Sequence, residues 1–272
     1  MEVMNLEKKL IVLDLEGTLL DSNNEISEYS KKRLKELENE GHIIVLSSTG
    51  SYTFVKKFYD QIGLTSPFIA EGGACLFNNN GSDVILSIDS NTFKDIINEN
   101  YSAIYSSFYH YKEHIFIHNK IDKLNFIYGI TDSTIIHEND YLKMDLINPN
   151  MVFLVVNLNE NESFLNNMKK YDNYLTLKEI AKDYMYYIYY LNVKNVNKAY
   201  STLEVMIENH MDESQIIAIG DSNADIELLS LKGETCAMLN SSDEIKRVAK
   251  HISKFDNDND GAIKFIDSIL NK

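Results

Sequence analysis

Two short apolar runs, each followed directly by a pair of acidic residues, constrain the fold of this chain more than any other feature. Residues 10–13 lead into the pair Asp14 and Glu16, and a second run leads into Asp221 and Asp225. Such runs, bounded by turn residues, are typical of buried strands in an α/β sheet, and these sheets bind ligands beyond the carboxyl ends of their strands. We therefore expect the four acids to meet at one edge of a sheet.

Strand-like segments alternate with amphipathic segments at both ends of the chain, a pattern that predicts parallel strands joined by crossover helices. Gly41 and Gly63 follow the first two amphipathic segments, where glycine commonly closes a helix. The expected strands comprise residues 10–15, 43–48, 67–70, 216–219 and 235–238, and the expected helices comprise residues 27–40, 51–62, 199–211 and 224–231.

The middle of the chain reads differently. Between about residues 90 and 192 tyrosines are dense, and the strand-like runs are residues 114–118, 151–158 and 185–193. We predict an α/β fold in which a Rossmann-like core with a parallel central sheet carries an inserted α+β cap domain. The expected domains are a core of residues 1–85 and 193–272 and an inserted cap of residues 86–192.

Charge and cysteine content narrow the classes of partner. The 26 basic and 41 acidic residues give a formal net charge of -15, which repels nucleic acid and anionic lipid, whereas a local cationic site could still bind a small anion. Cys75 and Cys236 match no disulfide or zinc pattern, and the apolar run near the start is too short for a signal sequence or a membrane span. We expect a cytoplasmic protein with neither a nucleic-acid nor a membrane partner.

The acid pairs are suited to phosphoryl transfer. A carboxylate such as Asp14 at a strand end can attack phosphorus and form an acyl phosphate, and a second acid such as Glu16 can protonate the leaving oxygen. A hydroxyl from the run 47–50 and the ammonium of Lys198, expected just before a helix, can hold phosphoryl oxygens. Each feature alone also fits a solvated turn, a helix cap or a surface lysine, but their order along the chain favours a site.

These motifs resemble those of the haloacid dehalogenase-like (HAD) phosphatases, and within them the Cof-like sugar-phosphatase group. The resemblance covers the core on both sides of the insertion. It rests on Asp14-Leu15-Glu16-Gly17-Thr18-Leu19-Leu20-Asp21, Thr49-Gly50, Ile69-Ala70-Glu71-Gly72-Gly73-Ala74, Asn197-Lys198-Ala199, Ala218-Ile219-Gly220-Asp221 and Ala237-Met238-Leu239-Asn240.

The resemblance implies a HAD-like core, a substrate-selecting cap and a role for each site residue. Asp14 would be the nucleophile and Glu16 the general acid/base. Thr49, Gly50 and Lys198 would bind the phosphoryl group. The acids implied for a Mg²⁺ ion are Asp14, Asp221 and Asp225, completed by the backbone carbonyl of Glu16. The implied activity is Mg²⁺-dependent hydrolysis of a small phosphorylated metabolite, such as a sugar phosphate.

Four positions depart from the family pattern. Glu16 replaces the usual aspartate and carries its carboxyl group about 1 Å further from the backbone, a shift that can cost ~100-fold in rate. Ser51, Gly72 and Ala224 replace an arginine and two asparagines. Glu16, Ser51 and Ala224 keep open the alternative of a descendant that binds a phosphorylated ligand or a partner without useful turnover. A further alternative keeps the covalent intermediate but transfers the phosphoryl group to a second substrate, as in a phosphomutase.

Other patterns have ordinary structural explanations. Residues 256–267 match a calcium loop except for aspartate at its last position, and we interpret them as an acidic turn before a helix. His110, His114 and His118 recur every four residues, but residues 114–118 alternate like a strand, which argues against a helical metal site. The tyrosines of residues 184–190 could stack on a substrate ring, although tyrosine is also a common strand former.

Overall fold

A computed structural model describes residues 7–78, 81, 83–125, 127–130, 132, 134–138 and 148–271. The chain divides into two compact units. The core unit comprises Met1–Thr49, Val55–Asp83 and Asn197–Lys272, and the inserted unit comprises Gly50–Phe54 and Val84–Val196. The functional division expected from the sequence, a catalytic core and a substrate-selecting cap, stays a prediction.

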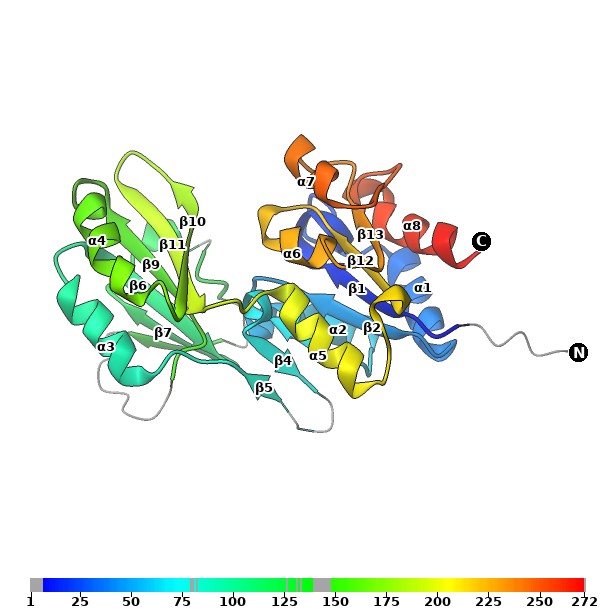
Figure 1. The fold of residues 1–272 in the computed structure, drawn as a ribbon, viewed down its shortest axis with the longest axis horizontal. Helices are drawn as coiled ribbons and strands as arrows, with labels where there is room; N and C mark the ends of the chain where they lie inside the picture. The colour runs from blue at the N-terminus through cyan, green and yellow to red at the C-terminus, as the bar shows by residue number, and fades with distance from the viewer. Residues whose placement is uncertain are drawn as a thin grey trace, which may run out of the picture. The chain divides into compact units, whose positions relative to one another are not determined.

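An eight-stranded sheet, all of whose strands except β5 belong to the core unit, confirms the predicted α/β class (Figure 1). Its order is β14-β13-β12-β1-β2-β3-β4-β5, and the strands from β14 to β3 run parallel. The fully buried β1 lies between β12 and β2, with Leu13 in register with both Ile219 and Leu46. The strands are β1 (Leu10–Asp14), β2 (Ile43–Ser47), β3 (Phe68–Ala70), β4 (Cys75–Phe77), β5 (Val84–Ile85), β12 (Ile216–Gly220), β13 (Glu234–Ala237) and β14 (His251–Ile252).

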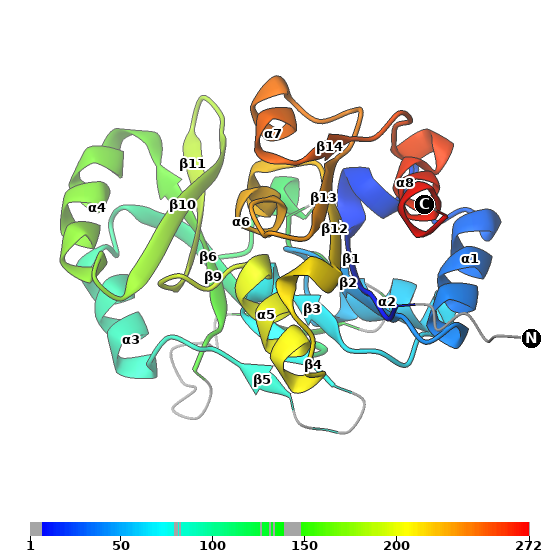
Figure 2. The ribbon, with the colours of Figure 1, turned by 45° about the vertical axis from the view of Figure 1, so that its right-hand side comes forward.

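Helices cover both faces of this sheet. Figure 2 shows α5 and α6 on one side and α1 and α8 on the other, and the two helices of each pair contact one another. In α1, Ser27 caps the first turn, Leu34 and Leu37 are buried, and Gly41 follows with a φ of 101°. The helices are α1 (Glu28–Asn39), α2 (Tyr52–Ile62), α5 (Lys198–Glu208), α6 (Ile226–Leu229), α7 (Asp243–Val248) and α8 (Gly261–Leu270).

Two helices begin one or two residues away from the expected position. The helix expected from Ala199 begins at Lys198, because the side chain of Asn197 caps it by accepting from Tyr200 N. The helix expected over 224–231 is only α6, because Asp225 closes a short 3-10 turn before it. Both shifts place a charged side chain at a helix start beside the ends of the core strands.

A second sheet, of six strands, carries the inserted unit. Its order is β10-β11-β9-β6-β7-β8, antiparallel except for the β7–β8 pair. The expected strand at 114–118 is therefore confirmed. The elements are α3 (Ser90–Glu99), β6 (Ile104–Tyr111), β7 (His114–His118), β8 (Ile135–Glu138), β9 (Met151–Asn157), α4 (Asn161–Met168), β10 (Leu175–Lys182) and β11 (Tyr186–Val193).

Alternation along these strands buries both faces of the second sheet. Tyr109 and Leu154 pack in one hydrophobic cluster, which also contains Phe93 of α3 and Phe164 of α4. Their chain neighbours, such as Phe108, pack in a second cluster on the opposite face. The inserted unit therefore has a hydrophobic core of its own.

Two aspartates of the loop at residues 256–260, which resembles a calcium loop, accept hydrogen bonds from serines of the same chain. Asp258 accepts hydrogen bonds from the backbone and the hydroxyl group of Ser22, both at 2.7 Å, and Asp260 accepts from the hydroxyl groups of Ser27 and Ser30. These bonds tie the segment before α1 to the start of α8. This geometry agrees with the interpretation of the loop as a structural acidic turn.

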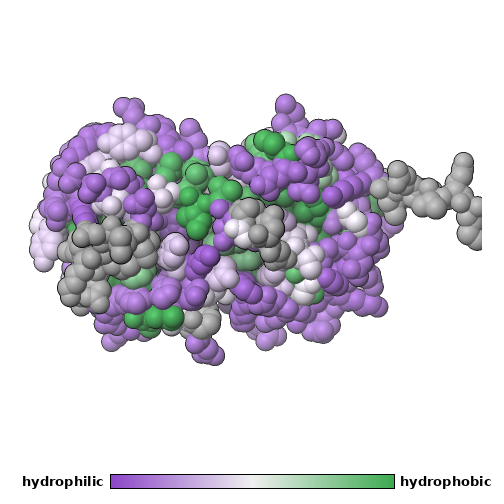
Figure 3. All heavy atoms as spheres, turned by 90° about the horizontal axis from the view of Figure 1, so that it is seen from below, coloured by the Kyte–Doolittle hydropathy of each residue, from purple (hydrophilic) through white to green (hydrophobic). Residues whose placement is uncertain are grey.

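Hydrophilic residues predominate on the face of the molecule drawn in Figure 3. This agrees with the composition, in which 25% of the residues are charged. None of the described helices combines the length and the apolar character that crossing a membrane requires.

Candidate active site

The ends of β1 and β12 bring three of the predicted acids together. Asp14 ends β1 and is 3% exposed, whereas Asp225 follows β12 and is completely buried. Carboxylate oxygens of Asp14, Asp221 and Asp225 all lie within 4.8 Å of one another. The strand register explains this meeting, because neighbouring parallel strands end at the same edge of the sheet.

Lys198 joins two of these carboxylates. Its side chain is 2% exposed and donates to Asp14 Oδ1 and, at 2.7 Å, to Asp225 Oδ1. A buried ammonium between two carboxylates is held by charge-assisted hydrogen bonds, which are stronger than neutral ones. The lysine that the sequence predicted near the acids therefore bridges two of them.

A close backbone contact fixes the start of α5, and with it Lys198. Gly73 has a φ of 99°, and a Cβ atom at this position would lie far closer than 3.0 Å to the backbone of Asn197. The hydroxyl group of Ser201 also donates to Gly73 O at 2.6 Å. Only glycine therefore permits this contact between α5 and the turn after β3.

Asp225 is engaged through both of its carboxylate oxygens. Oδ1 accepts from Lys198, and Oδ2 accepts from the backbone N–H groups of Asp221 and Ser222 at 3.1 Å and from the hydroxyl group of Ser222 at 3.2 Å. These bonds close the turn that carries Asp221. In this arrangement Asp225 orients Lys198 and Asp221.

Two side chains whose contributions the sequence analysis missed support the turn after β1. Thr18 Oγ1 donates to Asp221 Oδ1 at 3.3 Å, and Asn240 Nδ2 donates to Gly17 O at 2.8 Å. Gly17 has a φ of 74°, and a Cβ atom there would collide with the carboxylate of Asp221. Both side chains belong to the quoted motifs, which was the only signal available in the sequence.

Glu16 lies outside the three-carboxylate cluster. Its side chain is exposed, and Oε2 accepts a hydrogen bond of 2.8 Å from Ser48 Oγ, just beyond the end of β2. Thr49 is half-buried and follows Ser48, and Gly50 opens the short segment 50–54 of the inserted unit. The structure thus brings together Asp14, Lys198, Asp221 and Asp225, and it pairs Glu16 with a serine.

Burial and like charge shift the ionisation of the cluster. Burial, followed by the charge of Asp225, raises the pKa of Asp14 well above its usual value, although Lys198 opposes the shift. Burial and Asp225 likewise raise the pKa of Asp221 to about 6. Burial disfavours the charged form of Lys198, but Asp14 and Asp225 outweigh it and raise the pKa of the ammonium group.

The cluster contains three carboxyl groups and one ammonium group, and its oxygen atoms fit a magnesium ion. Mg²⁺ prefers oxygen ligands and binds through one or two carboxylates while it keeps several waters. The carboxylates of Asp14 and Asp221 provide such oxygens, and the spacing within 4.8 Å allows one ion to reach both.

A buried acid lies in the turn that follows β3. Glu71 is 1% exposed, has a φ of 53°, and neither of its carboxyl oxygens has a hydrogen-bond partner within the described part of the chain. Burial raises the pKa of this carboxyl group well above its usual value, so the neutral acid is favoured. The next residue, Gly72, donates its N–H to Ser48 O at 3.0 Å.

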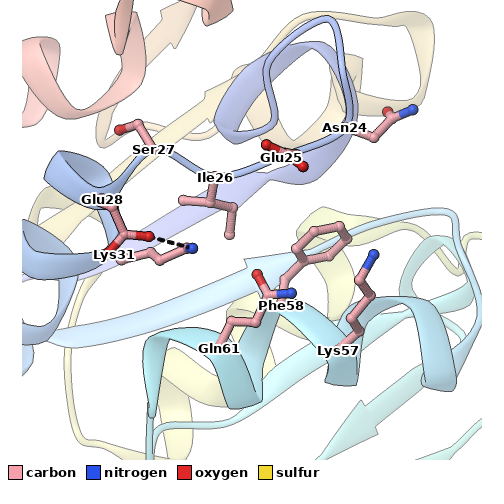
Figure 4. Close-up of a pocket in the computed structure, with 9 residues that line it drawn as sticks. All are labelled: Asn24, Glu25, Ile26, Ser27, Glu28, Lys31, Lys57, Phe58 and Gln61. Carbon is pink, nitrogen blue, oxygen red and sulfur yellow. Dashed lines mark hydrogen bonds and ion pairs between the residues drawn. The ribbon is translucent and has the colours of Figure 1, made fainter.

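A polar hollow of about 430 Å³ in the core unit is separate from the acids (Figure 4). It lies between residues 24–28 and α2, and Glu28 forms an ion pair with Lys31 at its edge. Two lysines and two glutamates balance its charge, so it lacks the net charge that would select an anion or a cation. Its lining comprises Asn24, Glu25, Ile26, Ser27, Glu28, Lys31, Lys57, Phe58 and Gln61.

Comparison with known proteins agrees with this geometry. Residues 11–266 match the model of a family described as haloacid dehalogenase-like hydrolase. The chain is 25% identical to the Mycoplasma genitalium protein named "Putative phosphatase MG265", over 97% of this chain and 99% of that protein. It is 24% identical to a 5-amino-6-(5-phospho-D-ribitylamino)uracil phosphatase of Bacillus subtilis, over 97% and 98%. The crystal structure of TM0651 from Thermotoga maritima, 17% identical, superposes with a TM-score of 0.83 over 96% of this chain and 97% of that one.

Proposed function

The chain belongs to the haloacid dehalogenase-like hydrolase family and is a phosphatase, and we propose that it hydrolyses a small phosphorylated metabolite through an aspartyl phosphate on Asp14. The observation that carries this proposal is the meeting of Asp14, Asp221 and Lys198 at the ends of neighbouring core strands. A nucleophilic carboxylate, a cation-binding acid and a fixed ammonium are the groups that phosphoryl transfer requires.

Two displacements at phosphorus make up the proposed reaction. In the first, an Asp14 oxygen bonds to phosphorus, the bond to the leaving oxygen breaks, and Glu16 gives that oxygen its proton. In the second, Glu16 takes a proton from water as the water oxygen attacks phosphorus, and the bond to Asp14 breaks. Lys198 holds Asp14 Oδ1, which leaves Oδ2 for attack.

The proposed phosphoryl and metal ligands follow from the same arrangement. Thr49 and Gly50 would bind phosphoryl oxygens with Lys198. Of the acids implied for Mg²⁺, Asp14 and Asp221 would hold the ion together with the backbone carbonyl of Glu16. Asp225, both of whose oxygens accept hydrogen bonds, would contribute to the metal site by orienting Asp221. When bound, the cation neutralises negative charge on the phosphoryl oxygens.

The substrate class is proposed from the relatives. The Bacillus subtilis protein named above and a second one of that species, 25% identical, carry the name 5-amino-6-(5-phospho-D-ribitylamino)uracil phosphatase. Both names describe a small metabolite that carries a phosphate group on a sugar alcohol. We propose a substrate of this size and polarity for the present chain. The alternative of a binding protein without turnover gains no support from these comparisons.

Hydrolysis assays test the proposal. We predict that the protein releases phosphate from p-nitrophenyl phosphate and from at least one sugar or sugar-alcohol phosphate, and that EDTA abolishes the release. Asp14→Asn should lower kcat by at least about 10⁴-fold, because it removes the nucleophile. Asp60→Asn, at an exposed aspartate paired with Lys56, is the matched control and should retain full activity.

Metal-independent turnover, or turnover that survives Asp14→Asn while both variants remain folded, would contradict the proposal.

A further inference from the structure

The hydrogen bond between Ser48 and Glu16 involves the position at which this chain has glutamate where the family usually has aspartate. A glutamate side chain has one more rotatable bond than aspartate, so an exposed glutamate samples more positions of its carboxyl group. Here Ser48 Oγ donates to Glu16 Oε2 at 2.8 Å. One fixed donor can select a single position of the longer side chain.

Ser48 itself is held rigidly. The residue is completely buried, its N–H donates to Ile69 O at 3.1 Å, and its carbonyl accepts from Gly72 N at 3.0 Å. The last contact depends on the turn at Glu71 and Gly72, whose φ values of 53° and 64° lie in the left-handed region. A non-glycine residue in this region is costly, and within the described part of the chain the buried carboxyl group of Glu71 also has no hydrogen-bond partner.

We propose that Ser48 is a positioning residue, whose hydroxyl group fixes the carboxyl group of Glu16 for proton transfer to the leaving oxygen. This inference rests on the proposed function, in which Glu16 is the general acid/base. Because the bond engages Oε2, the other oxygen of the carboxyl group remains available to carry the transferred proton. Ser48 thereby makes a glutamate effective at a position where the family usually has an aspartate.

The leaving group provides a readout that a purely structural role would not change. As the bond between phosphorus and the leaving oxygen breaks, an alkoxide is too basic to leave without a proton, whereas p-nitrophenolate is stable enough to leave without one. Loss of Ser48 should therefore slow hydrolysis of an alkyl phosphate far more than hydrolysis of p-nitrophenyl phosphate.

The experiment is a double-mutant cycle of Ser48→Ala and Glu16→Asp, measured with p-nitrophenyl phosphate and with the best alkyl phosphate of the hydrolysis panel. Ser48→Ala should lower kcat/KM for the alkyl phosphate by roughly 10- to 100-fold, the value of a hydrogen bond to a charged group. The ratio kcat/KM is compared because it reports the first displacement, whereas the second displacement, in which Glu16 also takes part, is common to both substrates. The aryl phosphate should lose less than about threefold.

The second arm of the cycle tests coupling. An aspartate carboxylate lies about 1 Å further from Ser48, beyond hydrogen-bond range, so Ser48→Ala should add less than about threefold in the Glu16→Asp background. Ser48→Thr, which keeps the hydroxyl group, should retain the parent's ratio of alkyl to aryl phosphate hydrolysis. The matched control is Ser66→Ala, which removes another serine hydroxyl that donates to a glutamate, Glu38, at 2.9 Å and should leave this dependence unchanged.

Equal losses for both leaving groups, or equal losses in the parent and the Glu16→Asp backgrounds, would overturn this inference while the phosphatase mechanism stands. Failure of the proposed mechanism is recognised separately, because the parent protein would then show no turnover or would retain it after Asp14→Asn.

Discussion

Asp221 faces two other carboxyl groups and one ammonium group, and burial together with Asp225 raises its pKa to about 6. A raised pKa means that the folded protein favours the protonated acid. The stability that this acid contributes is therefore complete below its ordinary pKa of about 4 and is lost as the pH rises through 6. In the metal-free protein, ionised Asp221 opposes folding at neutral pH.

We predict that Asp221→Asn stabilises the metal-free protein near neutral pH. A rise of the Asp221 pKa from about 4 to about 6 corresponds to at most about 3 kcal/mol of unfolding free energy, and about 1–3 kcal/mol is expected after partial solvent screening. The gain should fade as the pH falls from about 6 to about 4, where the parent acid is protonated. Urea unfolding in EDTA over this pH range measures the difference.

Magnesium provides the control for this experiment. A bound cation needs the ionised carboxylate, so Mg²⁺ should raise the unfolding free energy of the parent protein more than that of Asp221→Asn. The interpretation that burial and like charge destabilise ionised Asp221 would be contradicted if Asp221→Asn were less stable than the parent at neutral pH in EDTA. A difference in unfolding free energy that does not depend on pH would contradict it as well.

At the scale of elements, the start of α5 is set by its contact with the turn after β3. We predict that Gly73→Ala lowers the free energy of unfolding more than Gly41→Ala, although the two glycines have nearly equal φ values of 99° and 101°. Among the described residues, no neighbour lies within 4 Å of a methyl group added at Gly41, so its variant should lose only about 1–2 kcal/mol from backbone strain. Gly73→Ala should lose at least about 2 kcal/mol more, because backbone atoms of Asn197 must move.

Urea unfolding of the two variants measures this difference, and phosphatase assays show whether displacing α5 also displaces Lys198. Equal destabilisation by the two substitutions would show that α5 does not depend on the close contact.

Sequence patterns predicted the long buried strands and the three helices α1, α2 and α5 to within about three residues, because burial and glycine placement leave a local signal. They missed the short or edge strands β4, β5, β8 and β14, and in the inserted unit also β6 and β10. The patterns also placed Asp14 and Asp221 at one edge of the sheet, since parallel strand order implies that their ends meet. The bond from Ser48 to Glu16 could not be predicted, because it depends on a side-chain rotamer and on the left-handed turn at Glu71. The shortened α6 was missed for a similar reason, namely the side-chain bonds of Asp225.

The two units of the chain differ in the side chains that they contain. The core unit contains the carboxylate cluster and Lys198, so we assign the chemistry to it, and the inserted unit buries both faces of a separate sheet around apolar and aromatic residues. A net charge of -15 surrounds a site that is proposed to accept an anion. Groups within the site must therefore overcome the repulsion between this negative surface charge and an anionic substrate. The buried ammonium group of Lys198 and the proposed cation site provide the local positive charge for this.

The proposed mechanism requires that Asp14 becomes phosphorylated during turnover, and this intermediate can be trapped. A single turnover is quenched with acid, the acyl phosphate is reduced with borohydride, and the peptide that contains residue 14 is examined by mass spectrometry. We predict homoserine in place of Asp14, formed only when Mg²⁺ and substrate are both present and absent from the Asp14→Asn variant. Catalytic turnover without modification of Asp14, or modification of a different residue, would contradict the account.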